Sequence, residues 1–158
     1  MKPYFKVVAE NRKARHDFSI LDTCEAGIEL EGAEVKSIRC GRANLKDSFA
    51  RAERGQIWLF GMHISPYGFG RSEALNPLRT RKLLLAKSEI GKLIGKTQEK
   101  GLTLIPLKLY FRGNWAKVEL GIAKAKKVFE KRETLRKKTI DRETSRELRE
   151  RSTSLKLR

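Results

Sequence analysis

The last 35 residues, 124–158, cannot bury a hydrophobic core, so any compact fold must come from the residues before them. They hold 14 Lys or Arg against 6 Asp or Glu, with no Gly or Pro and few large apolar side chains. This composition still permits a helix. We therefore expect one domain in residues 1–123 and a basic tail in residues 124–158 that is disordered in the free protein and helical when bound.

The chain as a whole is strongly basic. Its net charge is +17 over 158 residues, and its isoelectric point is about 10.2. A surplus of this size is typical of proteins that bind nucleic acid. A protein of membrane surfaces, or one that is merely very soluble, is the alternative interpretation.

We expect neither a membrane span nor a secretory signal in this sequence. No stretch approaches the roughly 18 consecutive apolar residues of a membrane helix, and residues 1–15 lack the apolar centre of a signal peptide. Cys24 and Cys40 fit a reducing compartment, and neither lies at metal-binding spacing from another Cys or His. We expect a cytoplasmic protein without a metal or another cofactor.

Apolar periodicity and turn residues divide the first 123 residues into short elements. The pattern first predicts a basic arm over 1–15, an extended segment over 16–30 and a helix over 31–39 that ends at Gly41. A hairpin over 45–64 that turns at 53–56 and a long loop over 65–76 follow. The last predicted elements are a basic and then apolar segment over 79–86, a helix from Ser88 to near Gly101, and a hairpin of 102–111 with 115–122.

These elements predict a mainly β fold. Five or six strands with two or three short helices and much basic surface favour a small antiparallel OB-like closed β-barrel followed by the basic C-terminal tail. Pro106 lies inside one predicted strand, which indicates an edge position or a bulge there. OB barrels commonly bind oligonucleotides, in agreement with the charge.

Four stretches, in order along the chain, resemble a known family. They are Asn11-Arg12-Lys13-Ala14-Arg15-His16, then 29–32 (ELEG) running into 34–37 (EVKS), then 79–85 (RTRKLLL), and 123–127 (AKAKK). Together they resemble the SmpB family, whose members bind transfer-messenger RNA. The resemblance covers about residues 9–132.

The resemblance implies a specific role. Family members use an OB-type barrel to bind the tRNA-like domain of transfer-messenger RNA, act with elongation factor Tu, and enter ribosomes stalled on messages without a stop codon. There the protein stands in for the missing anticodon stem and codon at the decoding region of the small subunit. Its tail lies as a helix in the empty messenger channel, and translation resumes on the RNA's own reading frame, which appends a degradation tag.

The candidate RNA-binding residues are cations with a few amide, acidic and apolar side chains, in or near the matching stretches. They are Asn11, Arg12, Lys13, Arg15, His16, Glu25, Lys36, Arg79, Arg81, Lys82 and Leu84. Three cations close to a strand end at 79–82 favour phosphate contacts, and a carboxylate such as Glu25 can accept a hydrogen bond from a 2′-hydroxyl or a base amine. Leu84 could equally be plain core, and Glu34 could be structural or could face RNA.

In the tail, the candidate ribosome-binding residues are Lys126, Lys127, Phe129, Lys131 and Arg132. Phe129 could stack on a ribosomal base or pack back on the barrel. Two positions depart from the family pattern, which usually has Gly where this chain has Ala125 and often Asp where it has Glu130. The departure at Ala125 affects the expected geometry of a hinge and leaves the expected RNA-binding role unchanged.

Two other classes of protein compete with this interpretation. A nuclease would need clustered carboxylates for metal ions or a pair of His side chains, but His16 and His63 lie in unrelated contexts, and no acidic or Gly-rich phosphate-binding motif is present. We therefore expect no enzymatic activity and no catalytic residue. A generic structured-RNA binder or a ribosome-associated structural protein is the remaining alternative.

Overall fold

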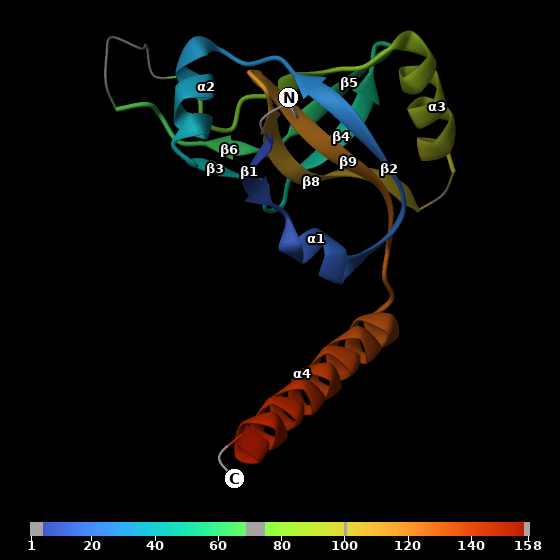
Figure 1. The fold of residues 1–158 in the computed structure, drawn as a ribbon. Coiled ribbons are helices and arrows are strands. Elements are labelled where there is room, and N and C mark those ends of the chain that lie inside the picture. The colour runs from blue at the N-terminus through green and yellow to red at the C-terminus, as the bar shows by residue number, and fades with distance from the viewer. Residues whose placement is uncertain (1–4, 69–74, 100, 157–158) are drawn as a thin grey trace. The chain divides into compact units, whose positions relative to one another are not determined.

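The structure is a computed structural model that describes residues 5–68, 75–99 and 101–156. The chain divides into two compact units, Met1–Ala125 and Lys126–Arg158. The first unit is mainly β, as predicted, and the second contains one long helix, α4 (Val128–Lys156) (Figure 1). None of the helices in the described ranges combines the length and the apolar character needed to cross a bilayer.

Six antiparallel strands of the first unit form a ring. Their pairings run β8–β4–β5–β7–β2–β9 and return from β9 to β8, and β1 joins the outer edge of β8. The strands are β1 (Phe5–Glu10), β2 (Phe18–Ile28), β4 (Phe49–Glu53), β5 (Gln56–Phe60), β7 (Arg81–Leu84), β8 (Leu102–Arg112) and β9 (Trp115–Ala125). This barrel-like ring is the architecture that the hairpin pattern predicts.

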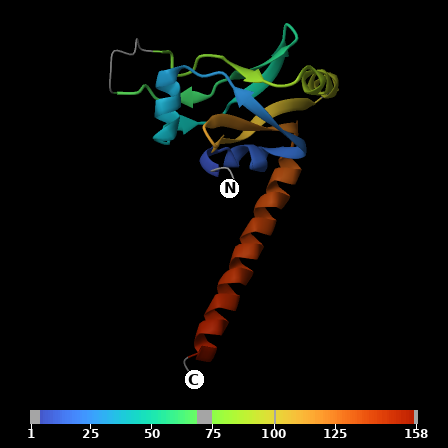
Figure 2. The same cartoon turned by 45° about the horizontal axis from the view of Figure 1, so that its top comes forward.

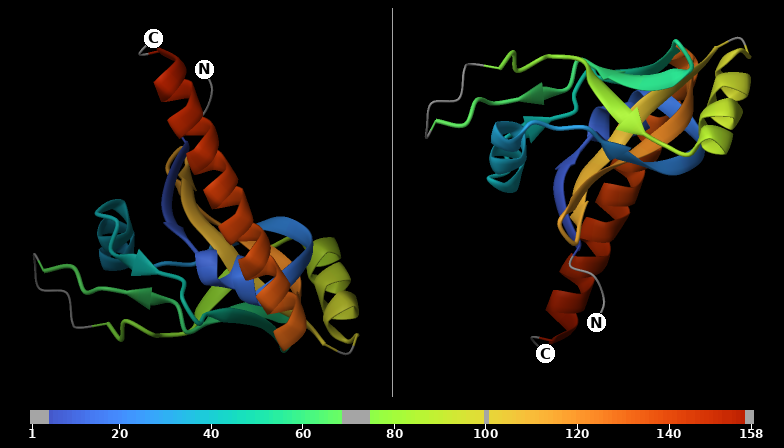
Figure 3. Two further views of the ribbon diagram at one scale, coloured as in Figure 1. Left: turned by 90° about the horizontal axis from the view of Figure 1, so that it is seen from below. Right: turned by 90° about the horizontal axis from the view of Figure 1, so that it is seen from above.

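Smaller elements complete the unit. The short strands β3 (Ala43–Asn44) and β6 (His63–Ile64) pair with each other and lie beside α2 (Gly32–Arg39) (Figure 2). The helix α3 (Lys87–Thr97) places Ile90 and Leu93 in the main core. The helix α1 (Arg12–Asp17) lies against β2 and β8 (Figure 3).

Two hydrophobic clusters occupy the two faces of the sheet. Inside the ring, alternate residues of the strands, such as Leu59, Leu83 and Leu120, are fully buried. On the outer face, Ala14 of α1 packs with Ile105, Leu107 and Ala123, and Phe18 and Ile20 border this second cluster. The second cluster holds α1 on the outside of β2, β8 and β9.

Both predicted hairpins are confirmed. The β4–β5 turn consists of Arg54 and Gly55 with φ of 51° and 69°, the two positive values that a type I′ turn requires. In the second hairpin, Arg112 of β8 pairs with Trp115 of β9. The register shifts between Pro106 and Lys108, so the proline sits at a bulge, one of its two predicted positions.

The predicted arm was wrong, because residues 5–10 form strand β1 and residues 12–17 form a helix. Strand β1 obtains its hydrogen bonds from the edge of β8, about 100 residues later in the chain, and a local pattern cannot show this pairing. The extended segment predicted over 16–30 begins at Phe18, since His16 and Asp17 complete α1. The helix predicted over 31–39 is confirmed as α2.

The next helix, α3, begins at Lys87, one residue before the predicted cap Ser88, and ends at Thr97. Its first turn is closed by the Glu89 carboxylate, which accepts a hydrogen bond from the Ala86 amide at 3.0 Å. Of the loop predicted over 65–76, residues 69–74 lie outside the described residues.

Candidate RNA-binding surface

Strand register brings residues distant in sequence into one outward-facing row. Leu84 of β7 pairs with Gly27 of β2, Gly27 pairs with Lys117 of β9, and Lys117 pairs with Tyr110 of β8. Their sequence neighbours Ala26, Leu83, Val118 and Leu109 all belong to the main core, so the row itself faces outward. Leu84 is 50% exposed, which excludes the core interpretation of this residue.

Glu25 lies on the same outward face, two residues before Gly27. Its carboxylate accepts a short hydrogen bond from the Tyr110 hydroxyl and lies 3.5 Å from Arg112 Nη1 and 3.8 Å from Lys117 Nζ. Burial and the neighbouring Glu25 raise the pKa of Tyr110. Tyr110 therefore stays protonated and holds the exposed carboxylate in one orientation between two cations.

An apolar groove of about 330 Å³ adjoins this cluster. Trp115, at the start of β9, is 75% exposed and lines the groove together with Leu84 and Lys117. An exposed aromatic ring beside cations can stack on a base while the cations contact phosphate. We call the whole set the Glu25 surface: Glu25, Gly27, Leu84, Tyr110, Arg112, Trp115 and Lys117.

The helix α1 presents three of the basic residues predicted for RNA binding, Arg12, Lys13 and Arg15, together with His16. The Arg12 side chain is 91% exposed, with Nε 4.0 Å from Glu10, and Arg15 is also exposed. Lys13 Nζ lies 2.8 Å from Asp47 Oδ1, and this hydrogen bond raises the pKa of Lys13 and lowers that of Asp47. His16 is half-buried, with Nδ1 3.0 Å from Asp17 Oδ1.

Asn11, in contrast, is buried and belongs to the protein interior. Its side-chain amide donates to the Leu45 and Pro106 carbonyls at 3.1 Å each, and its oxygen accepts from the Ala14 amide as the N-cap of α1. The predicted amide contact with RNA is therefore corrected to a positioning role. Asn11 fixes α1, and α1 displays the cations.

Arg81 needs the same correction. Its side chain is fully buried and donates to Glu34 Oε1 from Nε and Nη2, at 2.9 and 2.7 Å. It also donates to the carbonyls of Met62, Arg79 and Pro77, so no part of the guanidinium is exposed to a phosphate. The alternation of β7 explains the difference, because Arg81 and Leu83 face inward while Lys82 and Leu84 face outward.

The same buried carboxylate binds a second arginine. Arg79 is half-buried and donates to Glu34 from Nε and Nη2, at 2.9 and 2.6 Å. Burial alone would raise the pKa of Glu34, but hydrogen bonds from Arg79, from the Glu31 amide and from Arg81 lower it. Glu34 is thus structural, and it ties α2 to β7 and to the segment before β7.

The other predicted residues lie elsewhere. Lys36 is exposed on α2, with Nζ 5.6 Å from the centre of the Tyr67 ring. The tail candidates belong to the second unit: Lys126 and Lys127 precede α4, and Phe129, Lys131 and Arg132 lie near its start. The Lys127 amide donates to the Glu130 carboxylate at 3.2 Å, so Glu130 caps the helix.

Five members of the Glu25 surface were not predicted from the sequence: Gly27, Tyr110, Arg112, Trp115 and Lys117. For the last four, a signal was available within the second hairpin, because a turn at 113–114 places them on one face. Their proximity to Glu25 depends on the pairing of β2 with β9, which no local pattern shows.

The antiparallel ring, the outward Glu25 surface and the surplus of cations define an RNA-binding barrel protein. A family profile described as SmpB protein matches residues 8–150. The SsrA-binding protein of Carboxydothermus hydrogenoformans is 60% identical over 92% of this chain and 98% of its own length. The SsrA-binding protein of Geobacillus thermodenitrificans is 58% identical over 92% and 94%, and that of Enterococcus faecalis is 57% identical over 90% and 93%. The chain belongs to the SmpB family.

A solved structure agrees with this assignment. A chain described as "tmRNA-SmpB: a journey to the center of the bacterial ribosome" is 52% identical to this chain and superposes with a TM-score of 0.64. The match covers 75% of this chain and 84% of that chain. The likeness therefore extends to the fold as well as to the sequence.

Proposed function

We propose that this protein binds the tRNA-like domain of transfer-messenger RNA and delivers it to stalled ribosomes in the cytoplasm, where the nascent chain is tagged. The observation that carries the proposal is the high identity to proteins named SsrA-binding over nearly the whole chain. The matched ribosome-related structure supports the same partners. The protein acts as a binding factor with elongation factor Tu and catalyses no reaction itself.

The Glu25 surface supplies the chemistry for recognising structured RNA. The Glu25 carboxylate accepts from a 2′-hydroxyl or a base amine, and Arg112 and Lys117 beside it contact phosphate. Leu84 and Trp115 offer apolar area to an exposed base. Charge-assisted hydrogen bonds need a fixed geometry, and Tyr110 supplies it by holding the carboxylate.

The tail has a separate role on the ribosome. The helix α4 spans 29 residues and is rich in cations, with a polar sequence that gives it little apolar surface to bury. We infer that it is disordered in the free protein and becomes a helix in the empty messenger channel, where Lys126, Lys127, Phe129, Lys131 and Arg132 contact ribosomal RNA.

Tagging in a reconstituted translation reaction tests this proposal. The reaction contains a message without a stop codon, transfer-messenger RNA and elongation factor Tu, and the readout is the tag on the nascent chain. Full-length protein should support tagging. A form that ends at Ala125 should still bind the RNA but give no tag. Tagging without the protein, or equal tagging by both forms, would contradict the proposal.

A generic structured-RNA binder is the second candidate, and the overall charge of +17 favours it. Such a protein would bind any folded RNA of similar size and would lose affinity for all of them together as salt rises. Selectivity for the tRNA-like domain separates the two candidates.

A further inference from the structure

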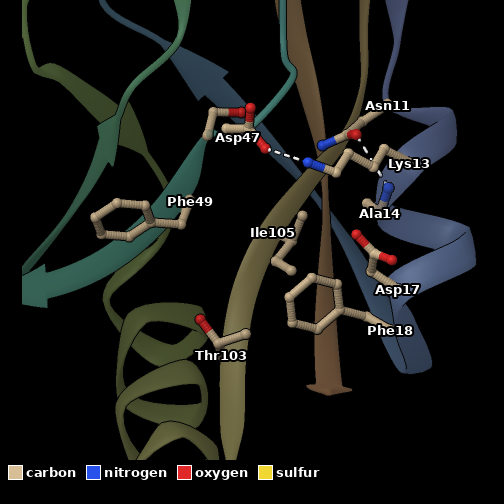
Figure 4. A pocket seen from close by; sticks show the side chains of 10 residues that line it. Asn11, Lys13, Ala14, Asp17, Phe18, Asp47, Phe49, Thr103 and Ile105 are labelled. Carbon is tan, nitrogen blue, oxygen red and sulfur yellow. Dashed lines mark hydrogen bonds and ion pairs between the residues drawn. The ribbon is translucent and has the colours of Figure 1, made fainter. Parts of the chain in front are cut away.

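A pocket under α1 lies outside the Glu25 surface and has no role in the function proposed above. It has a volume of about 330 Å³ and opens between α1, the start of β4 and the outer face of β8 (Figure 4). It forms where β8 changes neighbours. Strand β4 pairs with β8 at Leu104, and β1 pairs with β8 only from Lys108 onward. Between these two residues, the edge of β8 faces α1 and the pocket.

The pocket has an apolar interior and a polar rim. Ile105 and Ala14 are buried at its base, and the Phe18 ring forms one wall, as Figure 4 shows. Phe49 lines the cavity from the start of β4, with its ring directed away from Phe18. The Phe49 ring is 41% exposed and stacks on Phe60 with centroids 5.3 Å apart. The Lys13–Asp47 ion pair closes one side, and the Asp17 carboxylate and the Thr103 hydroxyl also line the cavity.

The chain holds Asp47 at this rim in an uncommon conformation. Its φ is 59°, in the left-handed region that few residues other than Gly adopt. The turn that contains Asp47 is closed by Ser48, whose amide and hydroxyl both donate to the Leu45 carbonyl. Gly61 passes so close that a Cβ there would lie 3.2 Å from the Asp47 carbonyl oxygen. The surrounding structure therefore fixes the Asp47 backbone in this conformation, close to the mouth of the cavity.

We propose that this pocket binds one unstacked base of transfer-messenger RNA, and that the base carries an exocyclic amine. A base has an apolar face and a polar edge, and the pocket offers an aromatic wall with hydroxyl and carboxylate groups around it. The carboxylates of Asp17 and Asp47 are acceptors, so they favour the amine of adenine, cytosine or guanine over uracil.

The cations around the pocket and its place on the outer face of the sheet favour RNA as the bound partner. The exposed cations Arg12, Lys13, Arg15 and Lys46 are on the pocket wall or within two residues of it, and they suit the phosphates that flank a bound base. The pocket also lies on the same outer face of β2, β8 and β9 that carries Glu25 farther along the strands. One RNA that binds the Glu25 surface and extends along this face therefore reaches both sites. The inference thus rests on the proposed function.

Chemical probing of transfer-messenger RNA with full-length protein tests the inference. Dimethyl sulfate modifies unpaired adenine and cytosine, kethoxal modifies guanine, and a carbodiimide modifies uracil. Wild-type protein should protect one unpaired base with an amine, and Phe49→Ala should restore its reactivity and weaken binding about fivefold or more. Phe49→Tyr keeps the ring and should preserve protection. Leu78→Ala, which removes an exposed apolar side chain elsewhere, is the matched control.

Two further variants distinguish the loss of base binding from misfolding of the protein. Thr103→Val and Asp47→Asn change the polar rim and leave Phe49 in place, so each should reduce protection of the same base without lowering the melting temperature. The inference would be overturned if Phe49→Ala changed the reactivity of no base. Protection of uracil alone would also overturn it. If wild-type protein binds the RNA selectively but none of the pocket variants changes the reactivity of a base, the proposed function stands and this inference fails. If wild-type protein shows no selective binding, both fail.

Discussion

Removing the Glu34 carboxylate should strongly destabilise the first unit. Glu34 accepts four hydrogen bonds from Arg79 and Arg81, and the Arg81 side chain is fully buried. Glu34→Ala leaves that guanidinium buried without its counter-ion, which costs about 3–5 kcal/mol. Unfolding free energies of small proteins are about 5–15 kcal/mol, so this loss is a large fraction of the total.

Thermal and urea unfolding, followed by circular dichroism, measure this effect. An unfolding entropy of about 2.1 cal/mol/K per residue over residues 1–125 gives about 4 °C per kcal/mol, so the melting temperature should fall by roughly 10–20 °C. Glu99→Ala removes an exposed carboxylate and is the matched control, with an expected change of less than about 0.5 kcal/mol.

A second substitution tests the assigned cause. Adding Arg81→Met to Glu34→Ala removes the buried charge that Glu34→Ala leaves without a partner, so the double variant should be more stable than Glu34→Ala alone by about 1 kcal/mol or more. The reasoning would be refuted if Glu34→Ala lowered the melting temperature by less than about 3 °C, or if Arg81→Met made the single variant still less stable.

The remaining predictions concern pH, a glycine, RNA affinity and salt. In the folded protein, the pKa of Glu34 lies below its ordinary value of 4.5. The contribution of the Glu34 carboxylate to stability is therefore present above pH 4.5 and is lost as pH falls through the folded pKa. In acid unfolding below pH 4.5, the difference in unfolding free energy between the wild-type protein and Glu34→Gln should shrink. Gly61→Ala should cost about 1–3 kcal/mol in urea unfolding, because φ is 74° and its Cβ would crowd the Asp47 carbonyl; a neutral result would contradict the close approach. Tyr110→Phe should weaken binding of the tRNA-like domain about two- to tenfold in a filter-binding titration, since Glu25 loses the hydrogen bond that orients it. Lys117→Ala should lower the slope of log Kd against log salt by about one, and an unchanged slope would exclude a phosphate contact.

The sequence predicted much of the fold, because the hairpins carry local signals. The turn follows from Gly55, which adopts positive φ without steric cost, and the bulge follows from Pro106, which has no N–H to donate to the ladder. Strand β1 could not be predicted in this way. Its hydrogen bonds come from β8, and six residues with mixed charge have no periodicity strong enough to define a strand.

The site was only partly predictable for a similar reason. Glu25 and Leu84 were expected from the family resemblance, and the structure exposes Leu84 and surrounds Glu25 with cations. Arg81 shows what composition alone cannot predict, because three cations within residues 79–82 do not reveal which of them faces inward. Only the alternation along β7, with Leu83 in the core, separates the buried Arg81 from the outward Lys82.

Selective binding of the tRNA-like domain is the most direct test of the central claim. A gel-shift titration at two salt concentrations would compare transfer-messenger RNA, its isolated tRNA-like domain and an unstructured RNA of equal length. Wild-type protein should bind the first two much more tightly than the third, and the double variant Glu25→Gln, Leu84→Ala should lose most of that preference while keeping its salt-dependent background. Equal affinity of the wild-type protein for all three RNAs, lost together as salt rises, would contradict the account.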